Sequence, residues 1–294
     1  MTLNKVFVIF FLLFQNSLLI ANDENGVVYG NDDRKDLFEI NNIRLLNLAR
    51  STAAMISNKD ISKIDDGLYN IKGKPLSSLK VCKSERYFNQ ITSAYCSGFL
   101  IAPDLLVTAG HCVKSKKDCK HFSWIFDYSV FQNGDYEETD FNIDKNNVFR
   151  CKKIISHTLS EKKKNDYSLI QLDRIVKNRK PLLYRKTGKI VLGTELLVIG
   201  HPSGLPTKIA DNAYVRKNES KNYFVANLDT FSGNSGSAVL DSKTGIVEGI
   251  LVRGEQDYIM DKKNKCLITK KCNDTGCAGE EMTRITNIKY LLDN

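Results

Sequence analysis

The sequence predicts an all-β protein. From about Leu76 onward, short apolar or alternating runs recur between turns rich in Gly, Asn, Asp and Lys. Many short strands separated by turns are typical of a β-barrel or a β-sandwich. With 294 residues, 42% of them hydrophobic, the chain can form one large all-β unit or two ordinary domains. It shows no internal repeat and no low-complexity linker.

The first residues predict a secretory signal peptide. Lys5 precedes the apolar run Val6–Phe14, and a second apolar patch ends at Ala21, after which we expect cleavage. Polar residues 15–17 interrupt the run, and no later stretch is long enough to cross a bilayer. We therefore expect residues 1–21 to be removed, no transmembrane segment in the mature chain, and a secreted or periplasmic protein.

Residues 22–75 form a predicted N-terminal extension. A short strand-like piece and a polar turn cover Val27–Arg34, and the spacing of Leu and Ile from Asp36 to about Ser57 is compatible with a helix. Residues Asp60–Pro75 indicate a loop. The sequence leaves two alternatives open, an arm packed on the main body or a propeptide.

The main body, residues 76–294, is expected to consist of strands closed by one short C-terminal helix at Asn287–Leu292. The expected strands are Gly98–Ala102, Leu105–Thr108, Ser123–Phe131, Asn147–Ile155, Tyr167–Leu172, Leu196–Gly200, Tyr223–Leu228, Ala238–Asp241 and Ile246–Arg253.

Eight cysteines in an exported chain predict disulfides. The alternative is a metal site at Cys266, Cys272 and Cys277, but these lack the Cys-x-x-Cys pairs of common zinc sites. We therefore expect no metal.

The net charge of +9 comes largely from short lysine clusters in polar, loop-like segments. Such clusters are most simply solvated surface, although a cell wall or membrane face could be an anionic partner. No nucleic-acid-binding motif accompanies them, so we expect no nucleic-acid partner.

The segment Asp229–Val239 contains a candidate nucleophile. Gly233 lies two residues before Ser235, and another glycine follows it. The backbone N–H groups of Gly233 and Ser235 could therefore hold an oxygen that becomes negative during attack on a carbonyl. A serine hydroxyl needs a neighbouring base to attack, and an apolar strand after the turn would anchor it.

Two further residues could support such a nucleophile. His111 follows an apolar strand and the small turn Ala109-Gly110, whereas the other histidines have contexts that indicate surface or loop. Asp166 lies where a lysine-rich loop enters an apolar strand, so it is either a turn residue or a carboxylate that orients the imidazole.

These segments together resemble the chymotrypsin/trypsin-like serine proteases, whose histidine, aspartate and serine follow in this order. The resemblance spans about residues 76–294 and depends on four blocks: Cys96-Ser-Gly-Phe-Leu, Thr108-Ala-Gly-His111-Cys112, Asp166-Tyr-Ser-Leu-Ile and Gly233-Asn-Ser235-Gly-Ser. Within the family, Asp229–Ser237 is most similar to the bacterial glutamyl-endopeptidase (V8-like) branch, and Val28–Arg34 resembles its mature amino terminus.

The resemblance implies two six-stranded antiparallel β-barrels, at about residues 76–175 and 185–286, with the active site between them. It implies His111, Asp166 and Ser235 as catalytic residues, Gly233 and Ser235 as oxyanion donors, and a Cys96–Cys112 disulfide. A substrate would add as a strand beside Val252-Arg253-Gly254. No cofactor is expected. The implied partners are polypeptide substrates and a protein inhibitor, and the implied state is a monomer.

Departures from the family pattern bear mainly on specificity. Asn234 replaces the aspartate that pairs with a freed amino terminus in animal trypsins, and Val252 replaces a serine that supports the catalytic aspartate. Leu251 stands where glutamate-specific members have a histidine, which argues against glutamate specificity.

The specificity pocket would contain Asp229, Thr230 and Glu280. Asp229 occupies the position of the trypsin aspartate that binds arginine or lysine; the alternative is a buried structural aspartate. Glu280 would add negative charge on the far wall. We therefore expect a basic residue before the cleaved bond. Residues 255–279, longer than the family needs and rich in cysteine, predict a disulfide-pinned loop at the pocket rim.

Two other functions are alternatives to a protease. A non-catalytic binding protein on the same scaffold is the main alternative, but such proteins usually lose a catalytic residue that this chain retains. An α/β-hydrolase fits poorly because its serine comes first in the chain, within Gly-x-Ser-x-Gly.

Overall fold

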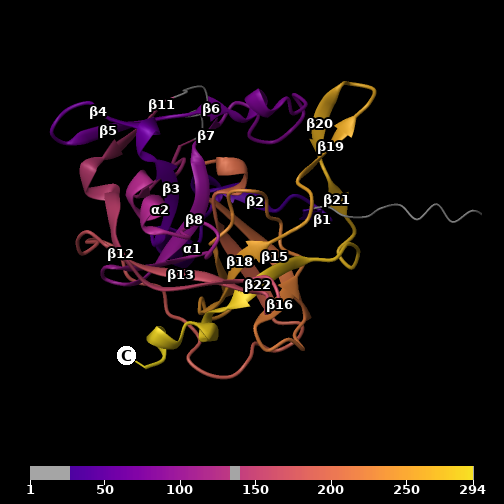
Figure 1. Ribbon diagram of the computed structural model, residues 1–294. Coiled ribbons are helices and arrows are strands. Elements are labelled where there is room, and N and C mark those ends of the chain that lie inside the picture. Colours follow the sequence, from indigo (N-terminus) through magenta and orange to yellow (C-terminus); the bar gives the residue numbers. More distant parts are fainter. Residues whose placement is uncertain (1–26, 133–139, 294) are drawn as a thin grey trace, which may run out of the picture.

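A computed structural model describes residues 27–132 and 140–293 (Figure 1). The predicted signal peptide lies outside these residues. The described chain has two short α-helices, α1 (Ile43–Ala49) and α2 (Lys116–His121). No described helix is long and apolar enough to pass through a membrane.

The first barrel is a closed antiparallel sheet with the strand order β10-β12-β13-β9-β8-β3. It is closed because β3 pairs with both β8 and β10. Its strands are β3 (Thr52–Ser57), β8 (Ala94–Ala102), β9 (Leu105–Thr108), β10 (Phe122–Phe126), β12 (Val148–Ser160) and β13 (Asn165–Leu172).

The second barrel has the order β14-β17-β18-β22-β16-β15, and a β14–β15 pairing closes it. Its strands are β14 (Glu195–Gly200), β15 (Lys208–Lys217), β16 (Tyr223–Ala226), β17 (Ala238–Asp241), β18 (Val247–Arg253) and β22 (Glu280–Arg284). The predicted fold, two six-stranded antiparallel barrels, is therefore confirmed.

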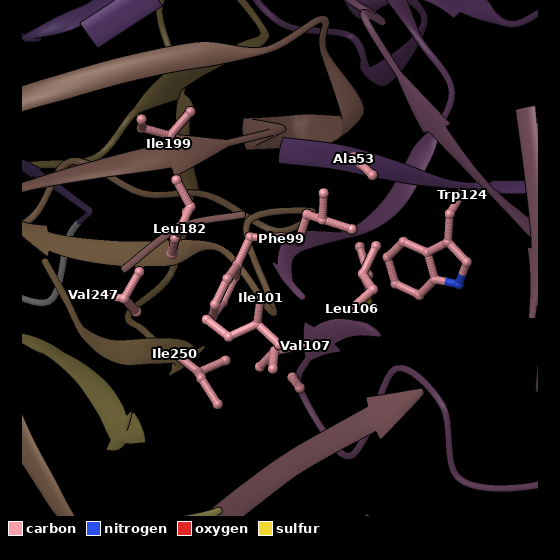
Figure 2. Close-up of a cluster of buried hydrophobic side chains, with 14 of the residues drawn as sticks. Ala53, Phe99, Ile101, Leu106, Val107, Trp124, Leu182, Ile199, Val247 and Ile250 are labelled. Atoms are coloured by element: carbon pink, nitrogen blue, oxygen red, sulfur yellow. The ribbon is translucent and has the colours of Figure 1, made fainter. Parts of the chain in front are cut away.

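The two barrels share one hydrophobic core. Phe99 of β8 packs in the same buried cluster as Ile199 of β14, Val247 and Ile250 of β18, as Figure 2 shows. All four side chains are fully buried. Since burying one such side chain contributes about 1.5–3 kcal/mol, this cluster fixes the barrels, and hence the cleft between them.

Several short strands lie outside the two barrels. Three β-strands form one sheet with the order β11-β5-β4, and three further pairs are β1 with β21, β6 with β7, and β19 with β20. Their bounds are β1 (Val28–Tyr29), β4 (Ile61–Lys63), β5 (Leu68–Lys72), β6 (Lys74–Pro75), β7 (Ile91–Thr92), β11 (Asp140–Asp144), β19 (Tyr258–Asp261), β20 (Cys266–Thr269) and β21 (Lys271–Cys272).

Short 3₁₀ turns complete the described chain. The predicted C-terminal helix is a pair of such turns, at Ile285–Asn287 and Lys289–Leu291. The others are Leu37–Glu39, Asn58–Asp60, Leu76–Leu79, Lys145–Asn147 and Pro202–Gly204.

The N-terminal region differs from the expectation. Only residues 43–49 of the predicted helix are α-helical, and β3 that follows is a barrel strand. The short strand β2 (Arg34–Asp36) extends the second barrel by pairing with β15. The expected loop at residues 60–75 contains β4 and β5. The protein body thus begins well before residue 76, and loss of residues 22–75 would open the first barrel.

All eight cysteines form disulfides, including the expected Cys96–Cys112. The other three pairs are Cys82–Cys266, Cys119–Cys151 and Cys272–Cys277. The expected disulfide-pinned loop is the β19–β20 hairpin, which projects in gold at the upper right of Figure 1. Cys82–Cys266 ties it to the chain that precedes β7.

Candidate active site

His111 lies in the turn after β9, held between a disulfide and a buried carboxylate. Cys112 bonds to Cys96 of β8, which fixes the residue after the histidine. Gly110 precedes it, and a Cβ there would lie 2.3 Å from the Thr158 carbonyl oxygen and 2.9 Å from Asp166 Oδ1. The turn therefore needs glycine to bring the imidazole this close to β13.

Asp166, on β13, contacts His111 with both carboxylate oxygens. Oδ2 lies 2.8 Å from His111 Nδ1, and Oδ1 accepts the His111 backbone N–H at 3.0 Å. Asp166 is buried, and its own N–H donates to Thr283 Oγ1. In the tautomer that carries its proton on Nδ1, His111 donates to this carboxylate and Nε2 is unprotonated.

Arg253 lies beside the His111–Asp166 pair. The sequence indicated Arg253 as a substrate-binding residue and not as a neighbour of Asp166. Its Nη1 lies 3.8 Å from Asp166 Oδ2, and its Nε donates to Glu281 at 2.8 Å. Lys164 also pairs with Glu281. A cation therefore lies beside Asp166 in a chain where Val252 replaces the family's supporting serine. The sequence offered only one indication of this contact, namely that Arg253 directly follows Val252.

Ser235 lies in a turn whose shape depends on two glycines. Gly233 and Gly236 have φ of 96° and 90°, in the left-handed region that glycine adopts without strain. A Cβ on Gly236 would lie 2.1 Å from the Ser97 carbonyl oxygen. The turn is fixed to the first barrel because Ser97 N–H donates to the Ser235 carbonyl at 2.8 Å.

The turns that carry the predicted nucleophile and base lie next to each other. Cys112 Sγ, next to His111, lies 3.6 Å from the Ser235 carbonyl oxygen. Among the described residues, no hydrogen bond joins the Ser235 hydroxyl to His111, and the N–H groups of Gly233 and Ser235 have no protein acceptor. Such contacts are often loose without substrate and tighten in the reactive complex.

A pocket of about 130 Å³ opens beside Ser235. It contains five of the six predicted substrate-binding residues, all but Asp229, and it adds two acidic residues, Glu255 and Asp257, that the sequence analysis did not single out. The lining residues are Val27, Thr230, Phe231, Ser232, Ser235, Leu251, Val252, Arg253, Gly254, Glu255, Asp257 and Glu280.

Glu280 is the most buried acid of this pocket, only 1% exposed. Its Oε2 accepts from Thr230 Oγ1 at 2.5 Å, and its Oε1 accepts from the Glu255 N–H at 3.4 Å. A Cβ on Gly254 would lie 1.9 Å from Oε2, so glycine makes room for the carboxyl group. Burial, and then the nearby Asp257 and Glu255 carboxylates, raise the pKa of Glu280 well above its usual range.

Asp229, the other acid expected in the pocket, lies outside it. Its Oδ1 and Oδ2 accept the backbone N–H groups of Tyr29 and Asp33, both at 2.8 Å. Burial raises its pKa to about 7. The expectation that Asp229 binds a basic substrate side chain is therefore corrected: it fastens the N-terminal segment to the second barrel, which is the structural alternative that the sequence left open.

His201 lies in a loop, as its sequence context allowed, but it is not on the surface. It is fully buried, with Nδ1 3.1 Å from the Leu205 carbonyl oxygen. Burial lowers its pKa to about 3, so it stays neutral. It lies directly under the Ser235 turn, because the position of a Cβ on Gly233 is 2.4 Å from the His201 carbonyl oxygen.

Comparisons with known proteins agree with this fold. The family described as "Trypsin-like peptidase domain" matches residues 96–250. A solved structure described as a Glu endopeptidase in complex with MPD is 18% identical, with a TM-score of 0.52 over 91% of this chain and 100% of that chain. At that identity the likeness shows the fold alone.

Among curated proteins, the uncharacterized protein y4fB of Sinorhizobium fredii (strain NBRC 101917 / NGR234) is 23% identical over 195 residues. The match covers 58% of this chain and 28% of the length of that relative. It therefore carries no information about activity.

Proposed function

The chain belongs to the trypsin-like peptidase family, and on that premise we propose that it is an exported serine endopeptidase with a His111–Asp166–Ser235 triad. The observation that carries the proposal is the double contact of Asp166 with His111, 2.8 and 3.0 Å, at the cleft that the Ser235 turn enters. A buried carboxylate that fixes an imidazole in this way is what a general base needs.

The reaction follows from the arrangement. His111 Nε2 takes the proton of the Ser235 hydroxyl as Oγ bonds to the substrate carbonyl carbon, and the N–H groups of Gly233 and Ser235 hold the oxyanion. The imidazolium then gives this proton to the leaving amine as the C–N bond breaks. Water, deprotonated by His111, then attacks the acyl carbon. The ester bond to Ser235 Oγ breaks, His111 returns the proton to Oγ, and the acid is released.

We further propose that the enzyme cleaves after a basic residue. Glu280, Glu255 and Asp257 line the pocket beside Ser235, and Glu280 has no cationic partner among the described residues. A buried carboxylate without a counter-ion is costly, and a lysine or arginine side chain of the substrate would supply that counter-ion.

Export is supported by the disulfides. All eight cysteines are paired, and structural disulfides persist in oxidising compartments such as the periplasm or the extracellular space.

The test is hydrolysis of casein and of peptide esters by the protein expressed without residues 1–21, together with labelling by a fluorophosphonate probe. We expect turnover and labelling, both lost in Ser235→Ala while circular dichroism stays unchanged. Folded protein with neither turnover nor labelling would favour the non-catalytic binding protein; hydrolysis that survives in Ser235→Ala would mean another nucleophile.

A further inference from the structure

The peptide bond between Ser232 and Gly233 determines whether the oxyanion site exists. Its N–H belongs to Gly233, one of the two proposed oxyanion donors, and its C=O belongs to Ser232. In a planar trans peptide these two groups point in opposite directions. Any contact that fixes the Ser232 carbonyl therefore also fixes the direction of the Gly233 N–H.

The Ser232 carbonyl is held by the turn at Pro202–Gly204. It accepts the Ser203 N–H at 2.6 Å. Ser203 has φ 54° and ψ 19°, a left-handed conformation that is uncommon for a residue other than glycine. This conformation is stabilised locally because Gly204 N–H donates to the His201 carbonyl at 3.0 Å.

The β19–β20 hairpin holds the same segment from the other side. Ser232 N–H donates to Asp257 Oδ2 at 3.0 Å, and Tyr258 OH lies 2.8 Å from Ser203 Oγ. The rings of Tyr258 and Phe231 lie 5.5 Å apart. Ser232 is thus held through both its N–H and its C=O. Asp257 accepts the N–H directly, and Tyr258 contacts Ser203, the residue that donates to the C=O.

The residue before the nucleophile supplies no charged support. Asn234 is buried and uncharged, and its Oδ1 accepts from Ser237 Oγ at 3.1 Å. The orientation of the oxyanion peptide must therefore come from neighbours other than an ion pair at this position.

We propose that Asp257 and Tyr258, at the base of the β19–β20 hairpin, are positioning residues that hold the Gly233 N–H toward the oxyanion. The inference rests on the proposed serine-protease function and adds a role for the hairpin in it. The Cys82–Cys266 disulfide then serves catalysis, because it fixes the hairpin that carries these two residues.

A positioning role predicts a specific kinetic pattern. An oxyanion donor acts in the transition state and little in the ground state, so its misplacement lowers kcat more than it raises KM. Misplacement of the donor also weakens the binding of peptide aldehyde inhibitors, which form a tetrahedral adduct with the nucleophile. Loss of a whole donor costs about 10²–10³-fold in kcat, and we expect about 10- to 100-fold when one support of the donor is removed.

The experiment compares Asp257→Ala, Asp257→Asn and Tyr258→Phe, with Met260→Ala as the matched control. Met260 lies on the same strand as Tyr258, is 57% exposed, and pairs with Leu267 of β20. Asp257→Asn keeps an acceptor oxygen and should retain most of the activity. Asp257→Ala and Tyr258→Phe should lower kcat and raise the inhibition constant of a peptide aldehyde by similar factors.

Asp257 also lines the pocket, so each variant is assayed with a lysine and with a neutral residue before the cleaved bond. A positioning role lowers kcat equally for both substrates, whereas a role in the pocket alone changes the ratio between them. If kcat and aldehyde affinity stay at wild-type values, or only that ratio changes, the inference is wrong. Tyr258→Phe removes one oxygen atom and decides the matter even if Asp257→Ala does not fold. An inactive wild-type protein would instead refute the proposed function.

Discussion

Replacement of Glu280 by glutamine is the sharpest test of the proposed specificity. The substitution keeps the size of the side chain and an acceptor for the Thr230 hydroxyl, and it removes the negative charge. Glu280 is 1% exposed, so a bound lysine ammonium would be desolvated together with it. Removing one partner of such a buried pair costs about 2–5 kcal/mol, which corresponds to about 30- to 4,000-fold in kcat/KM.

The assay measures kcat/KM for two peptides that differ only in lysine or glutamine before the cleaved bond. We expect the lysine peptide to lose most of its advantage in Glu280→Gln. The matched control is Glu281→Gln, because Glu281 is the next residue of β22 but pairs with Arg253 and Lys164 and does not line the pocket. A lysine preference unchanged in Glu280→Gln, or lost equally in both variants, would refute the assignment.

The raised pKa of Glu280 adds a pH dependence. In the free enzyme the carboxylate is protonated as pH falls through this raised pKa, so the lysine preference should decline at a higher pH than an ordinary glutamate would give. The folded protein binds this proton more tightly than the unfolded chain does. As pH rises above the pKa that Glu280 has in the unfolded chain, the free energy of unfolding therefore falls. Glu280→Gln should therefore raise the free energy of unfolding at neutral pH, measured by urea denaturation.

Three further predictions concern the remaining residues. Asp166→Asn should lower kcat by about 10⁴-fold without changing the fold, in a peptide-ester assay; a loss below tenfold would contradict its role. Asp229→Ala should leave the lysine preference intact but lower the free energy of unfolding in urea by about 1–3 kcal/mol, because a buried and a part-buried N–H group lose their acceptor; an altered lysine preference would show that Asp229 acts in the pocket. Gly236→Ala should lower that free energy by at least about 1–2 kcal/mol, and wild-type stability would show that the turn tolerates a Cβ at φ 90°.

The proposed catalytic residues could be chosen from short local patterns, which are readable without a structure. His111 follows β9, Asp166 lies at the start of β13, and Ser235 precedes β17. Asp229 could not be assigned in this way, because its partner Tyr29 is 200 positions away. Asp257 and Tyr258 follow no motif, and their contacts depend on where a hairpin folds.

The fold was predictable in its class and less so at its start. Residues 52–57 of β3 are almost all buried, because a strand inside a closed barrel packs on both faces. Such a strand reads as a continuous apolar run, which periodicity does not distinguish from a buried helix. Because helix α1 directly precedes β3, the apolar residues of both elements were interpreted as a single helix.

The N-terminal segment also sets an order of assembly. Asp36 forms a buried ion pair with Lys208, 172 positions later, and Val28 pairs with Lys271. On a ribosome, these early residues leave the tunnel long before their partners exist. The N-terminal segment is thus among the last parts to become fixed, and the second barrel reaches its native state only after β22 has been synthesised.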